Sequence, residues 1–365
     1  MTTYSAVRTT GIYCRPGCGA KPLAENVRTF ELAASAEAAG YRACLKCRPY
    51  RVAGPVRADA PELVCRAVQL IINGLLDEAN EEAVGARLGV SARHLRRLFL
   101  EHLGVTPDGF ARSRRAHFAR RLLDDTDLTI AEVAFASGFG SLRQFNRAMR
   151  EVFRSPPSDL RVRRRKADRL VADGGLLLRM PFGPDYDWTA TLGQLDNRLV
   201  PGVESIVDDT YRRTITLDGD PGMLEIGPGG SDHLLLRAHL PYWEGVIHVA
   251  ERAARLAGID RETPGAWAPL EIAVNAVAED IGNLVRRHGT PVDGLDHGLT
   301  HAFPAAEVLA DELGVVGELA RAVVAGKLRL DWAEPRDDLL ATLAAVGVPE
   351  PAASTVARRL TPTAG

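Results

Sequence analysis

The spacing of apolar residues changes along the chain and separates helical from extended segments. Between Pro61 and about Arg165, apolar residues recur at intervals of three and four, which predicts amphipathic helices. Polar residues precede several of these periodic runs, at positions where helix N-caps belong. The expected N-caps are Ser91, Asp127 and Ser141.

The second half of the chain mixes short extended segments with helices. Apolar runs bounded by Gly and Asp predict β-strands, and helical spacing at 189–198 and from about Trp243 to Leu360 predicts helices around them. The pattern as a whole predicts a multidomain α+β protein. The expected strands span 176–180, 211–216, 223–226 and 234–238.

Charge divides the chain into two unequal halves. The overall composition, 46% hydrophobic and 25% charged, is typical of globular domains, and the formal net charge is only −2. Residues 1–166, however, carry 28 Lys and Arg against 17 Asp and Glu, whereas the rest of the chain has a surplus of acidic residues. The front half therefore has the electrostatics of a polyanion binder.

Neither a signal peptide nor a membrane span is expected. The first residues lack a basic region followed by an apolar one, and no run approaches the ~18 uncharged apolar residues that a spanning helix needs. We therefore expect a cytoplasmic protein with no membrane partner.

Four of the five cysteines lie in the first 47 residues as two close pairs. Their C-x3-C and C-x2-C spacings let each pair clamp a metal from a tight turn, and four thiolates complete the tetrahedral shell that Zn²⁺ prefers. A segment this short also needs a staple to fold. Spacing alone favours a purely structural zinc site, since most closed all-cysteine sites are structural. The expected ligands are Cys14, Cys18, Cys44 and Cys47.

A longer run of residues resembles the metal-binding domain of Ada-type DNA alkylation-response proteins. The matching stretches are Arg8-Thr-Thr-Gly-Ile-Tyr-Cys-Arg-Pro-Gly-Cys18, Glu25-Asn-Val27 and Ala39-Gly-Tyr-Arg-Ala-Cys-Leu-Lys-Cys47. The resemblance covers residues 5–50 and is specific. Ala43, Leu45 and Tyr50 depart from the family pattern, and none of them is an expected ligand.

This resemblance implies a chemical role for one ligand. In the family, the first cysteine of the first pair takes a methyl group from a methylphosphotriester in the DNA backbone, and that residue corresponds to Cys14 here. A zinc-bound sulfur stays a thiolate, which is the nucleophilic form. The thioether product is not readily reversed, so each chain is expected to react once. By the same resemblance, Thr10, Lys21 and Arg42 are candidates to hold the phosphate.

Two helix-turn-helix patterns follow the cysteine segment. They occupy 80–99 and 129–150, with Gly89 and Gly138 at the turns, and a long helix at about 108–123 joins them. The pair, with Ser155-Pro-Pro157 behind it, resembles the AraC-type DNA-binding domain over residues 61–166. Polar side chains on each second helix suit a major groove. The candidate base readers are Arg93, His94, Arg96, Arg97, Arg143, Gln144, Asn146 and Arg147.

The back half resembles AlkA-type 3-methyladenine DNA glycosylases. The matching stretches include Asp185-Tyr-Asp-Trp188, Pro201-Gly-Val-Glu-Ser205 and Tyr211-Arg-Arg-Thr-Ile215. Where the family has a phosphate-gripping hairpin with two glycines, residues 345–351 retain one glycine and include two prolines, which have no N–H to donate. The family's catalytic aspartate would follow that hairpin, beyond the end of this sequence. We therefore expect a degenerate glycosylase-like region, and glycosylase activity is not expected.

These observations lead to one hypothesis and two alternatives. The hypothesis is a methylphosphotriester sensor that activates transcription of an alkylation response, with Zn²⁺ as cofactor, methylated and promoter DNA and RNA polymerase as partners, and association with the nucleoid. The alternatives are a regulator that still excises alkylated bases, and a plain AraC-type transcription factor with a structural zinc. The oligomeric state is not predicted. The expected domains are 1–52 (called the zinc module below), 61–166 (double helix-turn-helix), 170–255 (AlkA N-terminal-like α/β) and 260–362 (helical remnant).

Overall fold

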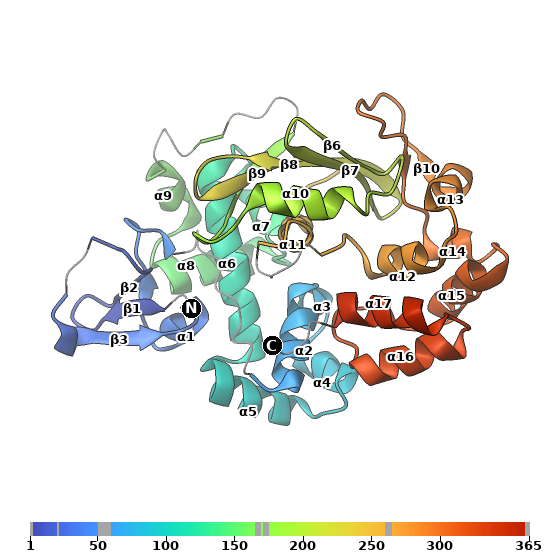
Figure 1. The fold of residues 1–365 in the computed structure, drawn as a ribbon. Coiled ribbons are helices and arrows are strands. Elements are labelled where there is room, and N and C mark those ends of the chain that lie inside the picture. Colours follow the sequence, from blue (N-terminus) through green and yellow to red (C-terminus); the bar gives the residue numbers. More distant parts are fainter. Residues whose placement is uncertain are drawn as a thin grey trace. The chain divides into compact units, whose positions relative to one another are not determined.

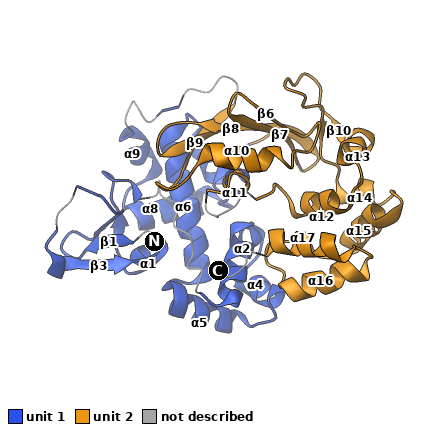
Figure 2. Cartoon of the chain, viewed as in Figure 1, with its two compact units in different colours: residues 1–171, 243–251 blue, residues 172–242, 252–365 orange. Residues whose placement is uncertain are grey.

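The computed structural model describes residues 3–19, 22–49, 60–164, 169–170, 175–259 and 265–361. It divides into two compact units, which are coloured separately in Figure 2. Unit 1 contains residues 1–171 together with 243–251, and unit 2 contains 172–242 and 252–365. The segment 243–251 therefore clusters with unit 1, although it lies inside the expected domain 170–255.

The zinc module is built on a small four-stranded sheet with the strand order β3-β1-β2-β4 (Figure 1). The central strand β1 pairs antiparallel with both β2 and β3, and β2 pairs in parallel with β4. Tyr4, Ala6, Tyr13 and Ala43 are buried in this module. Its elements are β1 (Tyr4–Val7), β2 (Ile12–Cys14), η1 (Ala24–Asn26), β3 (Val27–Phe30), α1 (Ala33–Ala38) and β4 (Arg42–Ala43).

The remainder of unit 1 is helical and contains both expected helix-turn-helix units. Helix α6 joins them, and its bounds agree closely with the long helix predicted at 108–123. Buried Phe99, Phe145 and Phe153 anchor the second helix of each unit in the core. The helices are α2 (Glu62–Ile72), α3 (Leu75–Glu78), α4 (Glu81–Arg87), α5 (Ala92–Leu103), α6 (Pro107–Asp125), α7 (Ile130–Ala136), α8 (Leu142–Phe153) and α9 (Pro157–Val162).

Two of the three predicted N-caps are confirmed and one is wrong. The side chains of Ser91 and Ser141 accept hydrogen bonds from backbone N–H groups at the starts of α5 and α8. Asp127 does not cap α7. That helix starts at a reciprocal capping box between Thr129 and Glu132, while the carboxylate of Asp127 pairs with Arg164 at 3.0 Å. Asp127 forms ion pairs with Arg164 and Arg169, which are far from it in the sequence and are brought close only by the tertiary fold.

Unit 2 contains a five-stranded antiparallel sheet with the order β5-β9-β8-β7-β6. All four predicted strands are confirmed. The edge strand β6 was missed because its four residues are all half-buried and give no alternating pattern. The strands are β5 (Leu176–Pro181), β6 (Glu204–Val207), β7 (Thr210–Leu217), β8 (Asp220–Pro228) and β9 (His233–His239), and α10 (Trp188–Asp196) follows β5.

The end of the chain is helical, as predicted. Its core includes Ile272, Leu319, Leu343 and Val356, all of which are nearly inaccessible to solvent. The short strands β10 (Thr290–Pro291) and β11 (His301–Ala302) pair within it. The helices are α11 (Val246–Leu256), α12 (Pro269–Val277), α13 (Ile281–His288), α14 (Ala306–Leu309), α15 (Gly314–Val324), α16 (Arg336–Ala345) and α17 (Glu350–Leu360).

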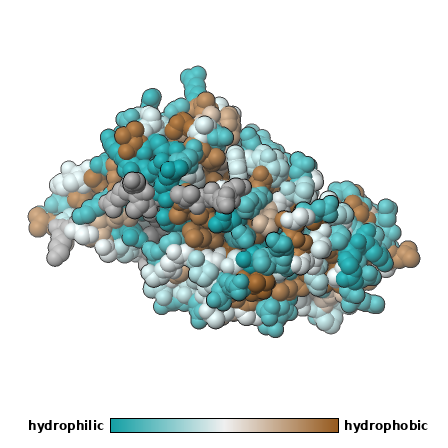
Figure 3. All heavy atoms as spheres, turned by 90° about the horizontal axis from the view of Figure 1, so that it is seen from above, coloured by the Kyte–Doolittle hydropathy of each residue, from teal (hydrophilic) through white to brown (hydrophobic). Residues whose placement is uncertain are grey.

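The exposed apolar residues are scattered. The most exposed are Leu313 and Val162, and the face seen in Figure 3 mixes hydrophilic residues with small hydrophobic patches. None of the helices described here has both the length and the apolar character that crossing a bilayer requires.

Candidate metal centre and nucleic-acid interface

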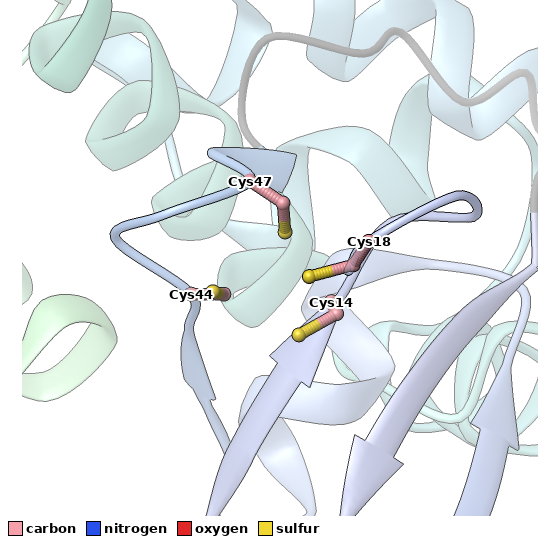
Figure 4. Close-up of side chains that lie close together, drawn as sticks. All are labelled: Cys14, Cys18, Cys44 and Cys47. Carbon is pink, nitrogen blue, oxygen red and sulfur yellow. The ribbon is translucent and has the colours of Figure 1, made fainter. Parts of the chain in front are cut away.

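The four predicted cysteine ligands come together at one end of the small sheet (Figure 4). Cys14 ends β2 and Cys44 directly follows β4, so the parallel pairing of these strands places the two sulfurs side by side. Cys18 lies in the turn that follows β2, and Cys47 lies in the turn that follows β4. All four Sγ atoms lie within 4.8 Å of one another. Zn–S bonds of ~2.3 Å place tetrahedral sulfurs about 3.8 Å apart, so the cluster fits Zn²⁺.

The chemistry of the donor set also calls for a cation. Burial, followed by repulsion from Cys47 and Cys44, raises the pKa of the Cys14 thiol well above its usual range. Burial and the charge of Cys44 raise the pKa of Cys47 to about 12. Burial opposes ionisation of Cys44 too, but backbone N–H groups of Cys47 and Lys46 lower its pKa. Four thiolates therefore require a bound cation here, and Zn²⁺ is the cofactor that fits them.

The exposure of the cysteines does not by itself single out an acceptor. Cys14 is buried, whereas Cys18, Cys44 and Cys47 are half-buried. The fifth cysteine, Cys65, is half-buried on α2, and its thiol lies 3.6 Å from the carbonyl oxygen of Ala60. No other group of three or more metal-ligating side chains is found among the described residues.

Two of the three candidate phosphate ligands lie on neighbouring loops and strands. Thr10 is exposed in the turn before β2, and its hydroxyl contacts the carbonyl of Val7 at 3.4 Å. The half-buried Arg42 lies on β4, and its backbone N–H donates to the carbonyl of Gly11 at 2.9 Å. Lys21 lies outside the described residues. Thr10 and Arg42 are thus brought to adjacent positions.

Two further basic residues flank the ligands and were missed. Arg15 follows Cys14 and Lys46 precedes Cys47, and both are exposed. Their positions next to the cysteines were visible in the sequence and indicate side chains that can meet a phosphate beside the cluster.

A hydrogen-bonded cluster on the other side of β2 also went unpredicted. The buried Tyr13 hydroxyl donates to Glu37 Oε1 at 2.6 Å and lies 3.1 Å from His117 Nε2, which is itself 2.6 Å from the same carboxylate oxygen. Burial, reinforced by the charge of Glu37, raises the pKa of Tyr13, so its hydroxyl remains a donor. The cluster joins β2, α1 and α6.

The recognition helices present part of the predicted polar edge to solvent. On α5, Arg93 and Arg97 are exposed and His94 is half-buried. On α8, Arg143, Gln144 and Arg147 are exposed. These six side chains are thus at least partly accessible to solvent.

Arg96 and Asn146 are engaged within the protein. Arg96 pairs with the buried Glu81 at 2.7 Å, an interaction that ties α5 to α4. Asn146 donates to the carbonyl of Leu142 at 2.8 Å on its own helix. Base reading by either residue requires that contact to be exchanged for one with DNA.

Three family models match successive parts of the chain. Residues 2–50 match the metal binding domain of Ada, residues 84–163 a helix-turn-helix domain, and residues 177–276 the AlkA N-terminal domain. The first two matches cover the cysteine cluster and both recognition helices.

A protein of Mycobacterium tuberculosis named "Probable bifunctional transcriptional activator/DNA repair enzyme AlkA" is 34% identical over 348 residues, which cover 84% of this chain and 69% of that protein. The present chain belongs to the same family as this protein. The Ada protein of Escherichia coli K12, named a bifunctional transcriptional activator/DNA repair enzyme, is 38% identical over 120 residues, or 32% of each chain. AdaA of Bacillus subtilis, which bears the same description, is 28% identical over 39% of this chain and 66% of its own.

The Ada-like family membership confirms the expected combination of zinc module, AraC-type helix-turn-helix and AlkA-like fold. A 3-methyladenine DNA glycosylase from Archaeoglobus fulgidus aligns with 50% of this chain and 78% of its own, at 14% identity and a TM-score of 0.41. That likeness is too weak to add to the family evidence.

Proposed function

We propose that this Ada-like regulator senses and repairs methylphosphotriesters in DNA by moving the methyl group onto Cys14. The observation that carries the proposal is the four-sulfur cluster, which lies in the segment matching the Ada metal-binding domain and in the same compact unit as both recognition helices. The choice of Cys14 among the four cysteines rests on the family resemblance.

The methyl transfer needs no reactant besides the Cys14 thiolate and the phosphotriester. The Cys14 thiolate attacks the methyl carbon, an S–C bond forms, and the C–O bond to the phosphotriester breaks. Its electron pair stays on the phosphate oxygen, which becomes an ordinary phosphodiester anion. Zinc would supply one property, a thiolate that persists at neutral pH despite its burial. Because the thioether product is not readily reversed, each chain is expected to react once.

Methylation would also act as a charge switch. Zn²⁺ with four thiolates carries two formal negative charges, and converting one thiolate to a thioether removes one of them. The module then repels phosphates less, beside the exposed Arg15 and Lys46. We propose that Thr10, Lys21 and Arg42 also contact the DNA backbone.

The helix-turn-helix pair would direct the methylated protein to its operator. Arg93, His94 and Arg97 on α5 would contact one major-groove segment and Arg143, Gln144 and Arg147 on α8 another. Arg96 and Asn146 come second as base readers because Arg96 pairs with the buried Glu81 and Asn146 is bonded to the backbone of its own helix. The hydrogen bond of Arg97, by contrast, is to another candidate reader, His94. Activation through RNA polymerase and residence at the nucleoid complete the proposal.

The back half is proposed to be a glycosylase relic without base-excision activity. In the turn between α16 and α17, the backbone N–H groups of Val346, Gly347 and Val348 donate to carbonyls of α16 at 3.0–3.2 Å. Pro349 and Pro351 have no N–H. This turn therefore offers few donors to a phosphate. Incubation with alkylated duplex is expected to release no methyladenine, and release by the purified chain would restore the bifunctional alternative.

Peptide mass spectrometry tests the methyl transfer directly. Zinc-loaded protein incubated with methylphosphotriester duplex is expected to gain one methyl group, on the peptide that contains Cys14. Cys14→Ala should gain none, and Cys65→Ser, which alters a cysteine outside the cluster, should behave like the wild type. A folded, zinc-loaded wild type that stays unmethylated would leave a DNA-binding regulator with a structural zinc.

A further inference from the structure

The zinc module packs directly on the helices that bear the recognition surfaces. Helix α1 lies against α6, and β4 lies against α8. The hydroxyl of Ser35 on α1 donates to the carbonyl of Leu103, the last residue of α5. The module therefore touches the C-terminal part of one recognition helix and a face of the other.

Three side chains form the polar centre of this interface. Tyr13 immediately precedes Cys14 on β2, Glu37 projects from α1, and His117 comes from α6. Their hydrogen bonds close a triangle with distances of 2.6, 2.6 and 3.1 Å. The Glu37 and His117 side chains are only 9% and 15% exposed, so water competes weakly for these bonds.

The same histidine reaches the second recognition helix. The His117 ring stacks at a tilt on Phe153, the last residue of α8, with centroids 5.8 Å apart. A second anchor flanks the other cysteine pair, where Arg48, one residue after Cys47, lies 3.6 Å from the buried Asp124 of α6. Both cysteine pairs are thus one residue away from a contact with the long helix.

We propose that the Tyr13–Glu37–His117 cluster couples the zinc module to the recognition helices, so that they bind DNA as one rigid body and methylation of Cys14 raises the affinity of the whole surface. This inference rests on the proposed methyl transfer. Docking leaves Arg143, Gln144 and Arg147 exposed, which favours a cooperative role over an inhibitory one. Two preorganised binding surfaces on one rigid body act at high effective concentration, an advantage that an undocked module loses.

His117→Leu tests the coupling, and two variants control it. His117→Gln keeps a hydrogen-bond donor toward Glu37 and is expected to restore function. His248→Leu removes another 2.6 Å histidine–carboxylate contact in unit 1, to Asp77, which lies outside the zinc module. It therefore controls for a general loss of stability.

The first readout is the methylation gain, defined as the ratio of affinities of methylated and unmethylated protein for a duplex selected in vitro on the methylated wild type. His117→Leu is expected to lower this gain about tenfold, while Cys14 is still methylated and the two control variants retain the gain. A lower melting temperature with an unchanged gain would reduce the cluster to a structural contact and overturn the proposal. A gain lost equally in His248→Leu would overturn it as well.

The second readout separates this inference from the methyl transfer itself. In the unmethylated full chain, His117→Leu should accelerate amide hydrogen exchange of residues 5–14, and His248→Leu should not. If the wild type accepts no methyl group, the proposed function fails. The readout is then the affinity of each unmethylated variant for a duplex selected in vitro on the unmethylated wild type, in place of the methylation gain. Unchanged exchange and affinity in His117→Leu would then refute the coupling.

Discussion

Arg213 provides a sharp test of how unit 2 is held together. Its side chain is fully buried on β7, and its guanidinium pairs with Glu204 at 3.1 Å and Glu271 at 2.7 Å. Arg213→Met keeps much of the volume and removes the charge. Glu204 would retain hydrogen bonds from the Tyr211 hydroxyl and the Val200 N–H, but Glu271 would lose its buried cation.

The expected loss in the free energy of unfolding is about 3–5 kcal/mol at pH 7, because removing one partner leaves buried carboxylates without their counter-charge. Burial already raises the pKa of Glu271 despite the nearby Arg213, and the substitution should raise it further. A carboxyl whose folded-state pKa lies above its unfolded value destabilises the fold as pH rises through that interval. The loss should therefore shrink as pH falls from 7 toward the unfolded pKa of ~4.3.

Denaturant unfolding followed by circular dichroism at pH 7 and pH 5 measures this difference. Arg212→Met is the matched control, since Arg212 lies next on β7 and pairs with Glu225 at 2.9 Å in a partly exposed position. It should cost about 1 kcal/mol or less. A cost for Arg213→Met that is equal at both pH values would assign the effect to packing, and a cost no larger than that of Arg212→Met would refute the reasoning.

Two further predictions concern unit 1. Removal of the metal with a chelator should unfold the zinc module, because so small a segment depends on its metal. Amide hydrogen exchange should then accelerate at residues 4–14, while α5 and α8 stay protected. Continued protection of residues 4–14 in metal-free protein would contradict this. Thr129→Ala should cost about 1 kcal/mol by removing the capping box of α7, as measured by thermal unfolding, whereas Ser158→Ala, on α9, should cost little; equal costs would contradict the capping argument.

Local patterns were enough to predict most of the elements. The helix-turn-helix units, the caps Ser91 and Ser141 and four strands of the large sheet depend on periodicities and capping chemistry within a few residues. The cap of α7 was predicted wrongly because a competing ion pair, from Asp127 to Arg164, spans 37 residues. Edge strand β6 was missed because it carries no alternating pattern.

The candidate site divides in the same way. Cysteine spacing predicted the four-sulfur cluster, since each pair needs only a local turn, and the resemblance carried the choice of Cys14. Exposure of Arg93 and Arg143 followed from helical phase. The pairing of Arg96 with Glu81 did not, because it depends on how α4 and α5 pack.

The sequence by itself determined the zinc ligands, the two recognition helices and the order of the domains, because each is encoded by spacing and by motifs along a continuous segment. Only the tertiary structure decided that Tyr13, Glu37 and His117 meet, that α11 begins within unit 1, and that Arg213 lies between two carboxylates. These contacts join residues far apart in the chain. These contacts form only when whole helices and strands pack together, so no local pattern in the sequence predicts them.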